Sequence, residues 1–539
     1  MPSKNARPLL KIVLGLFVAA GLLSASLSCQ RNGNGTNGQE STTTYTIADA
    51  TGDWGYPTPY GMYPRGPGYI RMSFIFDTLI WKNKDGELTG ALAEKWSYDE
   101  KQKTYTFSLR KDLKWHDGHP LTARDVVFTF QYMQNHPWPW MKSGLIRDVR
   151  TTDDSTVEIV LTNPYAPFPT NIAGTVPILP EHIWKTVEDP KKFRGEKAVI
   201  GSGPYRLSDY SPSHGTYLYL AWDDYYLGKP KFDRIQFVKY SEEITPTALR
   251  TGKVDAGGVP PETVNDLKKD GVTVASQPPV WAAKLMFNRK KAPFSHAKFR
   301  RAVAYAIDRK RLTKIVRRGH GIPGSPGLLP PSNEFWHNPD TPKYEYDPPQ
   351  AQKLLRQLGY ERGENQFFRK DGNVLQVELL VAPGRQEFGR TAEVMKRQLE
   401  SVGIRVEIRG MEAKTLDAML KQWHFEIALS GHGGLGGDPE ILNKMTLGTS
   451  FNSARYRQNK RLVEKLQEQL RQVDRTKRQK LVYDIQKLYA RDLPALTLYH
   501  PTWYWAHNEK TNIAYTPGGL AAGIPIPLNK IFFVSDREK

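Results

Sequence analysis

Five glycines crowd one nonapeptide of this 539-residue chain, residues 431–439, which reads GHGGLGGDP. It follows an apolar run at 425–429, so we expect the chain to leave a strand there and turn. Glycine reaches backbone angles closed to other residues and lets the backbone approach a ligand closely. The loop lacks the Gly-Lys-Ser/Thr ending of a phosphate-binding P-loop. One interpretation is a ligand-contacting loop, with His432, Gly433, Leu435 and Asp438 as candidate contacts, and the other is a plain surface turn.

A second candidate is His116-Asp117-Gly118-His119, in which two histidines flank a glycine turn. Two such histidines can supply half of a metal site. Asp117 and Gly118 are also good turn residues, and Pro120 fits the same role. We favour the turn, and we therefore expect no metal site here and no cofactor.

Aromatic side chains are a third signal. The segment 54–63 (WGYPTPYGMY) has neither helical nor alternating spacing, so its rings are poor candidates for a core stripe. Rings with a polar tip can stack on sugars, flat chelates or peptide side chains and hydrogen-bond at their edge. We take Trp54, Tyr56 and Tyr60 as candidate ligand contacts, against ordinary packing as the alternative. Arg385 is a further candidate, because a guanidinium can grip a carboxylate through two hydrogen bonds.

No catalytic constellation is visible in the sequence. There is no Gly-x-Ser-x-Gly elbow and no His-Glu-x-x-His, and Cys29 is the only cysteine. Paired acids such as Asp153-Asp154 would point to opposite faces of a strand, which does not suit shared acid–base work. These absences favour a protein that is not an enzyme.

The first residues predict export. Lys4, Arg7 and Lys11 precede an apolar run at 12–23, which is the anatomy of a secretory signal peptide. The run is shorter than the roughly 20 residues that a membrane-spanning helix needs. We therefore expect residues 1–28 to be a removable signal peptide.

Cys29 lies where such a leader would be cleaved, and no other cysteine can pair with it. The segment 26–29 (SLSC) resembles the bacterial lipobox, in which the cysteine is lipidated and becomes the mature N-terminus. Ser26 departs from that pattern, which has Leu at this position. Acyl chains hold a protein to a membrane without a spanning segment. Residues 29–44 are polar and are expected to form a flexible tether after a lipidated Cys29.

Strands and helices that would position the candidate residues follow from apolar spacing. Alternation at 104–109 and 156–161 predicts half-buried strands, and a capping pair, Thr122 and Asp125, predicts a helix start between them. Farther along, a strand at 374–381, a helix at 390–402 and a strand at 404–408 are typical of an α/β lobe. Apolar residues at helical spacing predict a helix after Asp347 and two late helices, marked by Leu354, Leu355, Leu358, Leu462, Leu466, Leu470, Leu481, Ile485 and Leu488.

Length and charge narrow the class of protein. The chain after the tether is longer than one hydrophobic core usually supports, so two or more lobes are expected. The formal net charge is +20, which can steer anionic solutes or favour an anionic membrane surface. The basic residues are scattered among acids, and no motif typical of nucleic-acid-binding modules is present. A nucleic-acid partner is therefore not expected.

An ordered series of motifs suggests a family. The motifs are LAEKW at 92–96, WHDGHPLTARDV at 115–126, GSGPY at 201–205, WDDYYLGKP at 222–230, GKVD at 252–255, APF at 292–294 and RRAVAYAIDR at 300–309. Each is modest evidence, but the ordered set resembles the large solute-binding proteins of peptide and nickel ABC importers, extracellular family 5. The resemblance covers about residues 45–533.

The resemblance implies an α/β, two-lobed periplasmic-binding-protein-like fold of the large cluster-C type, which closes about a hinge over a solute. Lobe I would comprise 45–279 and 500–539, with an inserted subdomain at about 66–180, and lobe II would comprise 280–499. Trp281 and Trp503 would then lie at the two crossings between lobes and are candidate contacts, and the loop 431–439 would line the cleft. Peptide-binding members of the family usually carry an acid four residues before the equivalent of Pro439, where this chain has Leu435.

The expected protein is an exported, lipid-anchored monomer that faces the periplasm or the cell exterior. It would capture a small solute and deliver it to an ABC permease in the membrane. A peptide is the family default, and Leu435 leaves a metal chelate or an oligosaccharide open as alternatives. The competing class is a secreted, membrane-anchored hydrolase.

Overall fold

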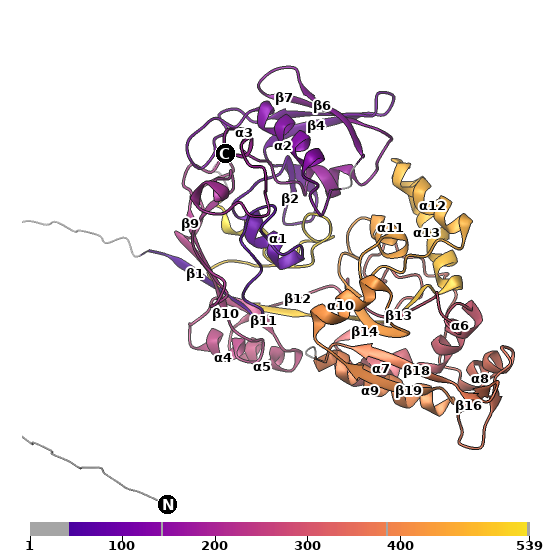
Figure 1. Cartoon of the computed structure of the whole chain (residues 1–539). Helices are drawn as coiled ribbons and strands as arrows, with labels where there is room; N and C mark the ends of the chain where they lie inside the picture. The colour runs from indigo at the N-terminus through magenta and orange to yellow at the C-terminus, as the bar shows by residue number, and fades with distance from the viewer. Residues whose placement is uncertain (1–41, 142–143, 384–385, 536–539) are drawn as a thin grey trace, which may run out of the picture. The chain divides into compact units, whose positions relative to one another are not determined.

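Most of the folded chain is organised around two mixed β-sheets. The computed structural model describes residues 42–141, 144–383 and 386–535. The predicted signal peptide, Cys29, most of the tether and Arg385 lie outside these residues. We call the part around the seven-stranded sheet lobe I and the part around the six-stranded sheet lobe II (Figure 1).

Lobe I is built on a sheet with strand order β12-β22-β11-β1-β10-β9-β8. Its strands are β1 (Thr44–Asp49), β8 (Tyr205–Ser211), β9 (Thr216–Ala221), β10 (Arg234–Lys239), β11 (Ala256–Val259), β12 (Thr273–Ser276) and β22 (Tyr504–His507). The central strand β1 pairs in parallel with both β10 and β11. The short helices α4 (Thr245–Arg250) and α5 (Val264–Lys269) contact β11 and β12.

An inserted part of lobe I carries its own sheet, with order β4-β5-β7-β6. It contains β4 (Ala93–Asp99), β5 (Thr104–Leu109), β6 (Ile146–Thr151), β7 (Thr156–Leu161) and α2 (Ala123–Asn135). The strands predicted at 104–109 and 156–161 are confirmed. The predicted helix start is also confirmed, since Thr122 and Asp125 form a capping box before α2. Around them lie α1 (Gly66–Ser73), β2 (Ile80–Lys82), β3 (Leu88–Gly90) and α3 (Glu181–Trp184).

Lobe II is built on a sheet with order β14-β21-β13-β20-β18-β19. Its strands are β13 (Ala282–Phe287), β14 (Gly321–Pro323), β18 (Gln376–Val381), β19 (Arg405–Gly410), β20 (Ile427–His432) and β21 (Ala495–Pro501). Strand β18 pairs in parallel with β19 and with β20. A small sheet of β15 (Glu361–Arg362), β16 (Phe368–Lys370) and β17 (Asn373–Val374) precedes β18.

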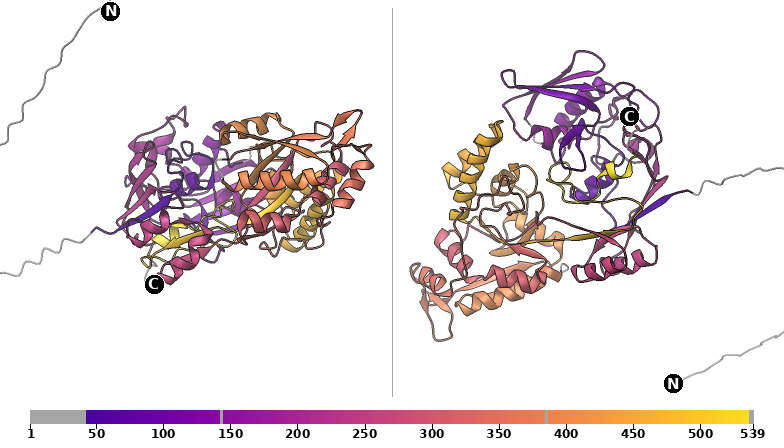
Figure 2. Two further views of the ribbon diagram at one scale, coloured as in Figure 1. Left: turned by 90° about the horizontal axis from the view of Figure 1, so that it is seen from below. Right: turned by 180° about the vertical axis from the view of Figure 1, so that it is seen from behind.

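Most of the longer helices belong to lobe II (Figure 2). They are α6 (Ala297–Ala306), α7 (Arg309–Arg317), α8 (Pro348–Arg356), α9 (Gln386–Ser401), α10 (Ala413–Gln422), α11 (Glu440–Leu447), α12 (Lys460–Arg471) and α13 (Arg475–Asp492). The predicted helix after Asp347 is α8, whose first turn is capped by that aspartate. The helix predicted at 390–402 is α9, which begins four residues earlier. None of the helices among the described residues is long and apolar enough to span a bilayer.

The chain passes between the two sheets twice. The first passage lies between β12 and β13, over residues 277–281, and the second lies between β21 and β22, over residues 502–503. Each lobe buries its own apolar side chains. One continuous core joins the main sheet of lobe I to the inserted sheet, and separate clusters pack on the sheet of lobe II.

Candidate functional site

Both lobes present the carboxyl ends of parallel strands. In lobe I the segments that follow β1, β10 and β11 leave the same edge of the sheet, and in lobe II those that follow β18, β19 and β20 do so. In open α/β sheets, ligands bind in the crevice outside the carboxyl ends of the strands. A solute site is therefore expected among these six segments and the two passages of the chain.

Direct contacts join the two lobes at this place. The Arg65 Nη2 atom lies 2.9 Å from Asp417 Oδ2, which links the residue before α1 to helix α10, the helix that follows β19. The same guanidinium lies over the ring of Phe451, 5.5 Å from its centre. The two carboxyl edges thus face each other across the lobes.

The glycine-rich loop that follows β20 meets the two tryptophans of the passages. Trp281 and Trp503 lie with ring centres 5.4 Å apart. A Cβ at Gly431 would overlap the six-membered ring of Trp281, and one at Gly433 would lie 3.3 Å from Cδ1 in the five-membered ring of the same indole. Glycine is required at 431 because the indole occupies the space of a side chain. The structure therefore brings Trp281, Trp503 and Gly433 together beside the two passages.

His432 ends β20 with its side chain buried. Its Nδ1 atom lies 3.0 Å from the Gly433 carbonyl oxygen, whereas Nε2 is buried and has no hydrogen-bond partner among the described residues. Burial, and then the charge of Lys284, lower the pKa of His432 well below its ordinary value. The imidazole is therefore neutral at physiological pH.

Two other candidate side chains of the loop, Leu435 and Asp438, already interact with other parts of the protein. Leu435 has no exposed surface and packs in a core cluster of lobe II. Asp438 accepts two hydrogen bonds from Arg478, at 2.6 and 2.7 Å. Both side chains are therefore engaged within lobe II.

The three aromatic candidates of segment 54–63 have different surroundings. Trp54 follows β1 at the carboxyl edge, and its Nε1 donates to Asp49 Oδ2 at 3.0 Å. Tyr56 donates to the Gly195 carbonyl, and Tyr60 donates to that of His136, and both pack against aromatic rings of lobe I. Trp54 lies at the edge, whereas Tyr56 and Tyr60 contribute to the packing of lobe I.

An acid that the sequence reading missed follows β10. The side chain of Glu242 is exposed to solvent. The protein around it nevertheless raises its pKa, first through desolvation and then through the charges of Glu243 and Glu387, against the opposing charge of Arg317. Arg317 and Glu387 belong to α7 and α9 of lobe II, where they form an ion pair of 2.5 Å. Glu242 is thus an accessible carboxylate that faces lobe II, and its place after a parallel strand was the signal that could have identified it.

A buried lysine connects the inserted part to the last loop of the chain. The Lys82 Nζ atom donates to the carbonyls of Gly518 and Gly519, at 3.2 and 2.7 Å. Burial lowers the pKa of Lys82 to about 8, and the nearby charge of Asp438 opposes that change. A Cβ at Gly437 would lie 3.0 Å from Gly523. The loop at 517–525 therefore supports the glycine-rich loop from the side of lobe I.

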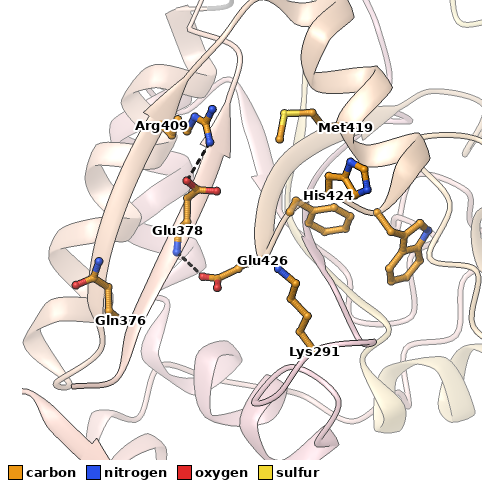
Figure 3. A pocket seen from close by; sticks show the side chains of 9 residues that line it. Lys291, Gln376, Glu378, Arg409, Met419, His424 and Glu426 are labelled. Atoms are coloured by element: carbon orange, nitrogen blue, oxygen red, sulfur yellow. Dashed lines mark hydrogen bonds and ion pairs between the residues drawn. The ribbon is translucent and has the colours of Figure 1, made fainter. Parts of the chain in front are cut away.

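A surface hollow of about 540 Å³ lies elsewhere on lobe II (Figure 3). Its charged groups already interact: Arg409 Nη1 lies 3.4 Å from Glu378 Oε2, and Glu426 accepts the Glu378 amide at 2.8 Å. Gln376 and Glu378 belong to the first half of β18. This hollow is away from the carboxyl ends of β18 and β20, so we do not take it as the solute site.

Comparisons with known proteins agree on one family. Residues 87–454 match the model of the bacterial extracellular solute-binding proteins, family 5. The dipeptide-binding protein of Escherichia coli is 31% identical over 66% of this chain and 69% of its own length. The nickel-binding periplasmic protein of Escherichia coli is 26% identical over 84% of this chain and 88% of its own length.

Solved structures show the same fold. The structure of NikZ from Campylobacter jejuni, in complex with Ni(L-His), has a TM-score of 0.76 at 20% identity and covers 92% of this chain and 99% of that protein. The oligopeptide-binding protein AppA from Bacillus subtilis, in complex with a nonapeptide, has a TM-score of 0.73 at 21% identity and covers 90% and 98%. These likenesses confirm the two-lobed fold expected from the motifs. The chain belongs to family 5 of the bacterial extracellular solute-binding proteins and is the substrate-binding component of an ABC importer.

Proposed function

We propose that this protein captures a short peptide with a free amino terminus between its two lobes and delivers it to an ABC permease. The observation that carries the proposal is the accessible carboxylate of Glu242, which follows β10 and faces lobe II. An ammonium group is the ligand group that such a carboxylate binds best, since charge-assisted hydrogen bonds are about twice as strong as neutral ones. The dipeptide-binding relative supports the same class of ligand.

Glu242 would bind the amine of the peptide, in place of the acid that peptide-binding members of the family carry where this chain has Leu435. Leu435 is buried in the core of lobe II, and Arg478 already holds Asp438. An acid on lobe I can fix the amine equally well, because closure brings both lobes onto the ligand. In this proposal Trp54, Trp281 and Trp503 contact the side chains of the peptide, the Gly433 backbone contacts its main chain, and Arg385 binds its carboxylate.

Closure couples binding to transport. We propose that lobe I comprises 45–279 and 500–539, with its inserted subdomain at about 66–180, that lobe II comprises 280–499, and that 277–281 and 502–503 act as the hinge. The Arg65–Asp417 ion pair and the hydrogen bond from Asn171 to Glu440 join the lobes and would stabilise the closed form. A ligand shifts the population towards that form only by binding it better than the open form.

A metal chelate is the second candidate ligand. In the part of the chain that the structure describes, the buried Nε2 atom of His432 has no hydrogen-bond partner, and a neutral imidazole nitrogen is a good metal ligand. The nickel-binding relative points to the same class. Neither ligand requires catalysis, and we propose that the protein is not an enzyme. Formation of product from peptides or glycans by the pure protein would instead favour the competing hydrolase.

Titration calorimetry with a panel of dipeptides tests the proposed ligand. We expect stoichiometric binding, and a loss of about ten- to hundredfold in affinity in Glu242→Gln, as the removal of a hydrogen bond to a charged group predicts. Glu243→Gln, which changes the next exposed acid, is the matched control and should bind normally. N-acetylated peptides should bind weakly to all three proteins. If free-amine peptides fail to bind while a nickel–histidine chelate binds, the second candidate replaces the first.

Export follows from membership of an extracellular family. We further propose that residues 1–28 are a signal peptide and that Cys29 is lipidated, so that a monomer is tethered to the membrane. Mass spectrometry of the protein from its membrane fraction should show an acylated N-terminal cysteine. Cys29→Ala should remove the added mass and release the folded protein from the membrane, and an unmodified Cys29 would refute the anchor.

A further inference from the structure

Two histidines and an aspartate from distant parts of the chain meet on the outside of lobe I. Asp117 Oδ2 lies 2.8 Å from His182 Nε2, and Asp117 Oδ1 lies 3.3 Å from His119 Nδ1. The two imidazole rings are stacked, with centres 4.2 Å apart. One ligand atom from each of the three residues can be chosen so that all lie within 4.8 Å of one another.

The backbone around these residues holds them in place. The turn closes through hydrogen bonds from the Trp115 amide to the His119 carbonyl and from the Gly118 amide to the Trp115 carbonyl, both of 2.9 Å. Gly118 has φ +86°, a conformation that favours glycine. His182 lies in α3, and the Asp125 carboxylate anchors the start of that helix by accepting the Glu181 amide at 2.9 Å.

His116, the other histidine of the motif, takes no part in this cluster. It is buried, with Nε2 2.9 Å from the Gly203 carbonyl and with its ring packed against Trp222. The side chains of His116 and His119 therefore lie in different places, and only His119 belongs to the cluster. The second imidazole of the cluster comes instead from His182, which the motif does not contain.

We propose that Asp117, His119 and His182 bind one divalent transition-metal ion of the zinc or nickel class. Such ions lie about 2.0–2.2 Å from histidine nitrogen and carboxylate oxygen, which places neighbouring ligand atoms roughly 3.4 Å apart. The observed separations of 2.8 and 3.3 Å need only small side-chain adjustments to meet that geometry. The exposed fractions of 26%, 60% and 29% for the three side chains leave an open side for water ligands.

The local charge favours a cation. Desolvation raises the pKa of Asp117, but hydrogen bonds from His182 and His119 lower it by more. The pKa is therefore below its ordinary value, and the group is a carboxylate at neutral pH. Asp125 lies close enough to interact with His182. A bound ion would link the turn at 115–119 to α3, and would stabilise the inserted part of lobe I by mass action.

Metal binding to the untagged, chelator-treated protein tests this site. Titration with Zn²⁺ and with Ni²⁺ should show one bound ion per chain and a rise in melting temperature. His119→Ala and Asp117→Asn should each lower the affinity at least about tenfold, since loss of even an outer-shell partner costs about 10–100-fold. His214→Ala, which removes an exposed histidine from a different loop, is the control and should bind the ion normally.

The outcomes separate this site from the solute site. His119 is the most exposed of the three residues, so its alanine variant should retain the circular dichroism spectrum and peptide affinity of the unmodified protein. Co²⁺ in the site should give visible absorption bands that His119→Ala abolishes. If the unmodified protein binds no ion, or if both variants bind Zn²⁺ and Ni²⁺ as tightly as it does, the site is refuted, whatever the result with peptides.

Discussion

Arg478 holds Asp438 at the end of the glycine-rich loop by two hydrogen bonds, in a pair that is almost fully buried, with 5% and 11% of the side chains exposed. Arg478 lies in α13 and also donates to Gln469 of α12. The acid that the sequence offered as a ligand contact thus anchors the loop to two helices. Its role is to set the position of the backbone that meets Trp281.

Removal of Arg478 should destabilise lobe II. Arg478→Met leaves a buried carboxylate without its partner, and breaking a buried ion pair costs about 3–5 kcal/mol. The free energy of unfolding in urea should fall by about that amount. The double variant Arg478→Met/Asp438→Asn removes both charges and should recover part of the loss. A single variant as stable as the unmodified protein would contradict this role.

Glu242 should make peptide binding sensitive to pH. Its pKa is raised in the folded protein, so the carboxylate takes up a proton at a higher pH than an ordinary glutamate, whose pKa is about 4.3. Peptide affinity should therefore begin to fall during acidification while ordinary carboxylates are still ionised. Calorimetry across pH 4–8 measures the effect, and Glu242→Gln should flatten the profile.

Glu242 should affect folding stability in the opposite direction from peptide affinity as the pH changes. A carboxyl whose folded pKa is raised favours folding most when it is protonated, and this contribution is lost as pH rises from the unfolded to the folded pKa. Relative to Glu242→Gln, the unmodified protein should therefore lose stability as pH rises through that window. Equal pH dependence of urea unfolding in the two proteins would contradict the raised pKa.

Gly431 should not tolerate a side chain. Gly431→Ala places a Cβ in the space of the Trp281 ring, and overpacking of this kind costs about 1–3 kcal/mol. The indole must move, so the affinity for solute should fall together with the melting temperature. Gly389→Ala is the matched control, since a Cβ there meets no atom of the described residues within 4 Å and lies in α9, where alanine is favoured. Normal stability and binding in Gly431→Ala would show that Trp281 does not need this space.

Arg65 should act on closure more than on stability. The Arg65–Asp417 pair is partly exposed, at 36% and 26% of the side chains, and such pairs contribute at most about 1 kcal/mol. Arg65→Ala should leave the melting temperature nearly unchanged. Because the pair joins the lobes, the ligand-free variant should show a larger radius of gyration in small-angle scattering, and saturating ligand should restore the closed value. Arg124→Ala, which loses a contact within lobe I, should show neither change.

Local sequence patterns alone identified much of the secondary structure. The alternation at 104–109 and 156–161 and the capping groups Thr122 and Asp347 each act within a few residues, so their outcome does not depend on distant parts of the chain. The ordered motifs extended this to the family and the two-lobed fold. The place of Trp281 and Trp503 at the two passages followed from that fold.

Only the tertiary structure decided which side chains are free to act. Asp438 is held by Arg478, 40 residues later, and Leu435 faces a core that several helices complete. Glu242 gained its position because parallel strands bring their carboxyl ends to one edge, and Asp117 met His182 across 65 residues because α3 packs beside the turn. The sequence determined the types of group and their local backbone. Their partners were decided by long-range packing, which brings together residues that no local spacing relates.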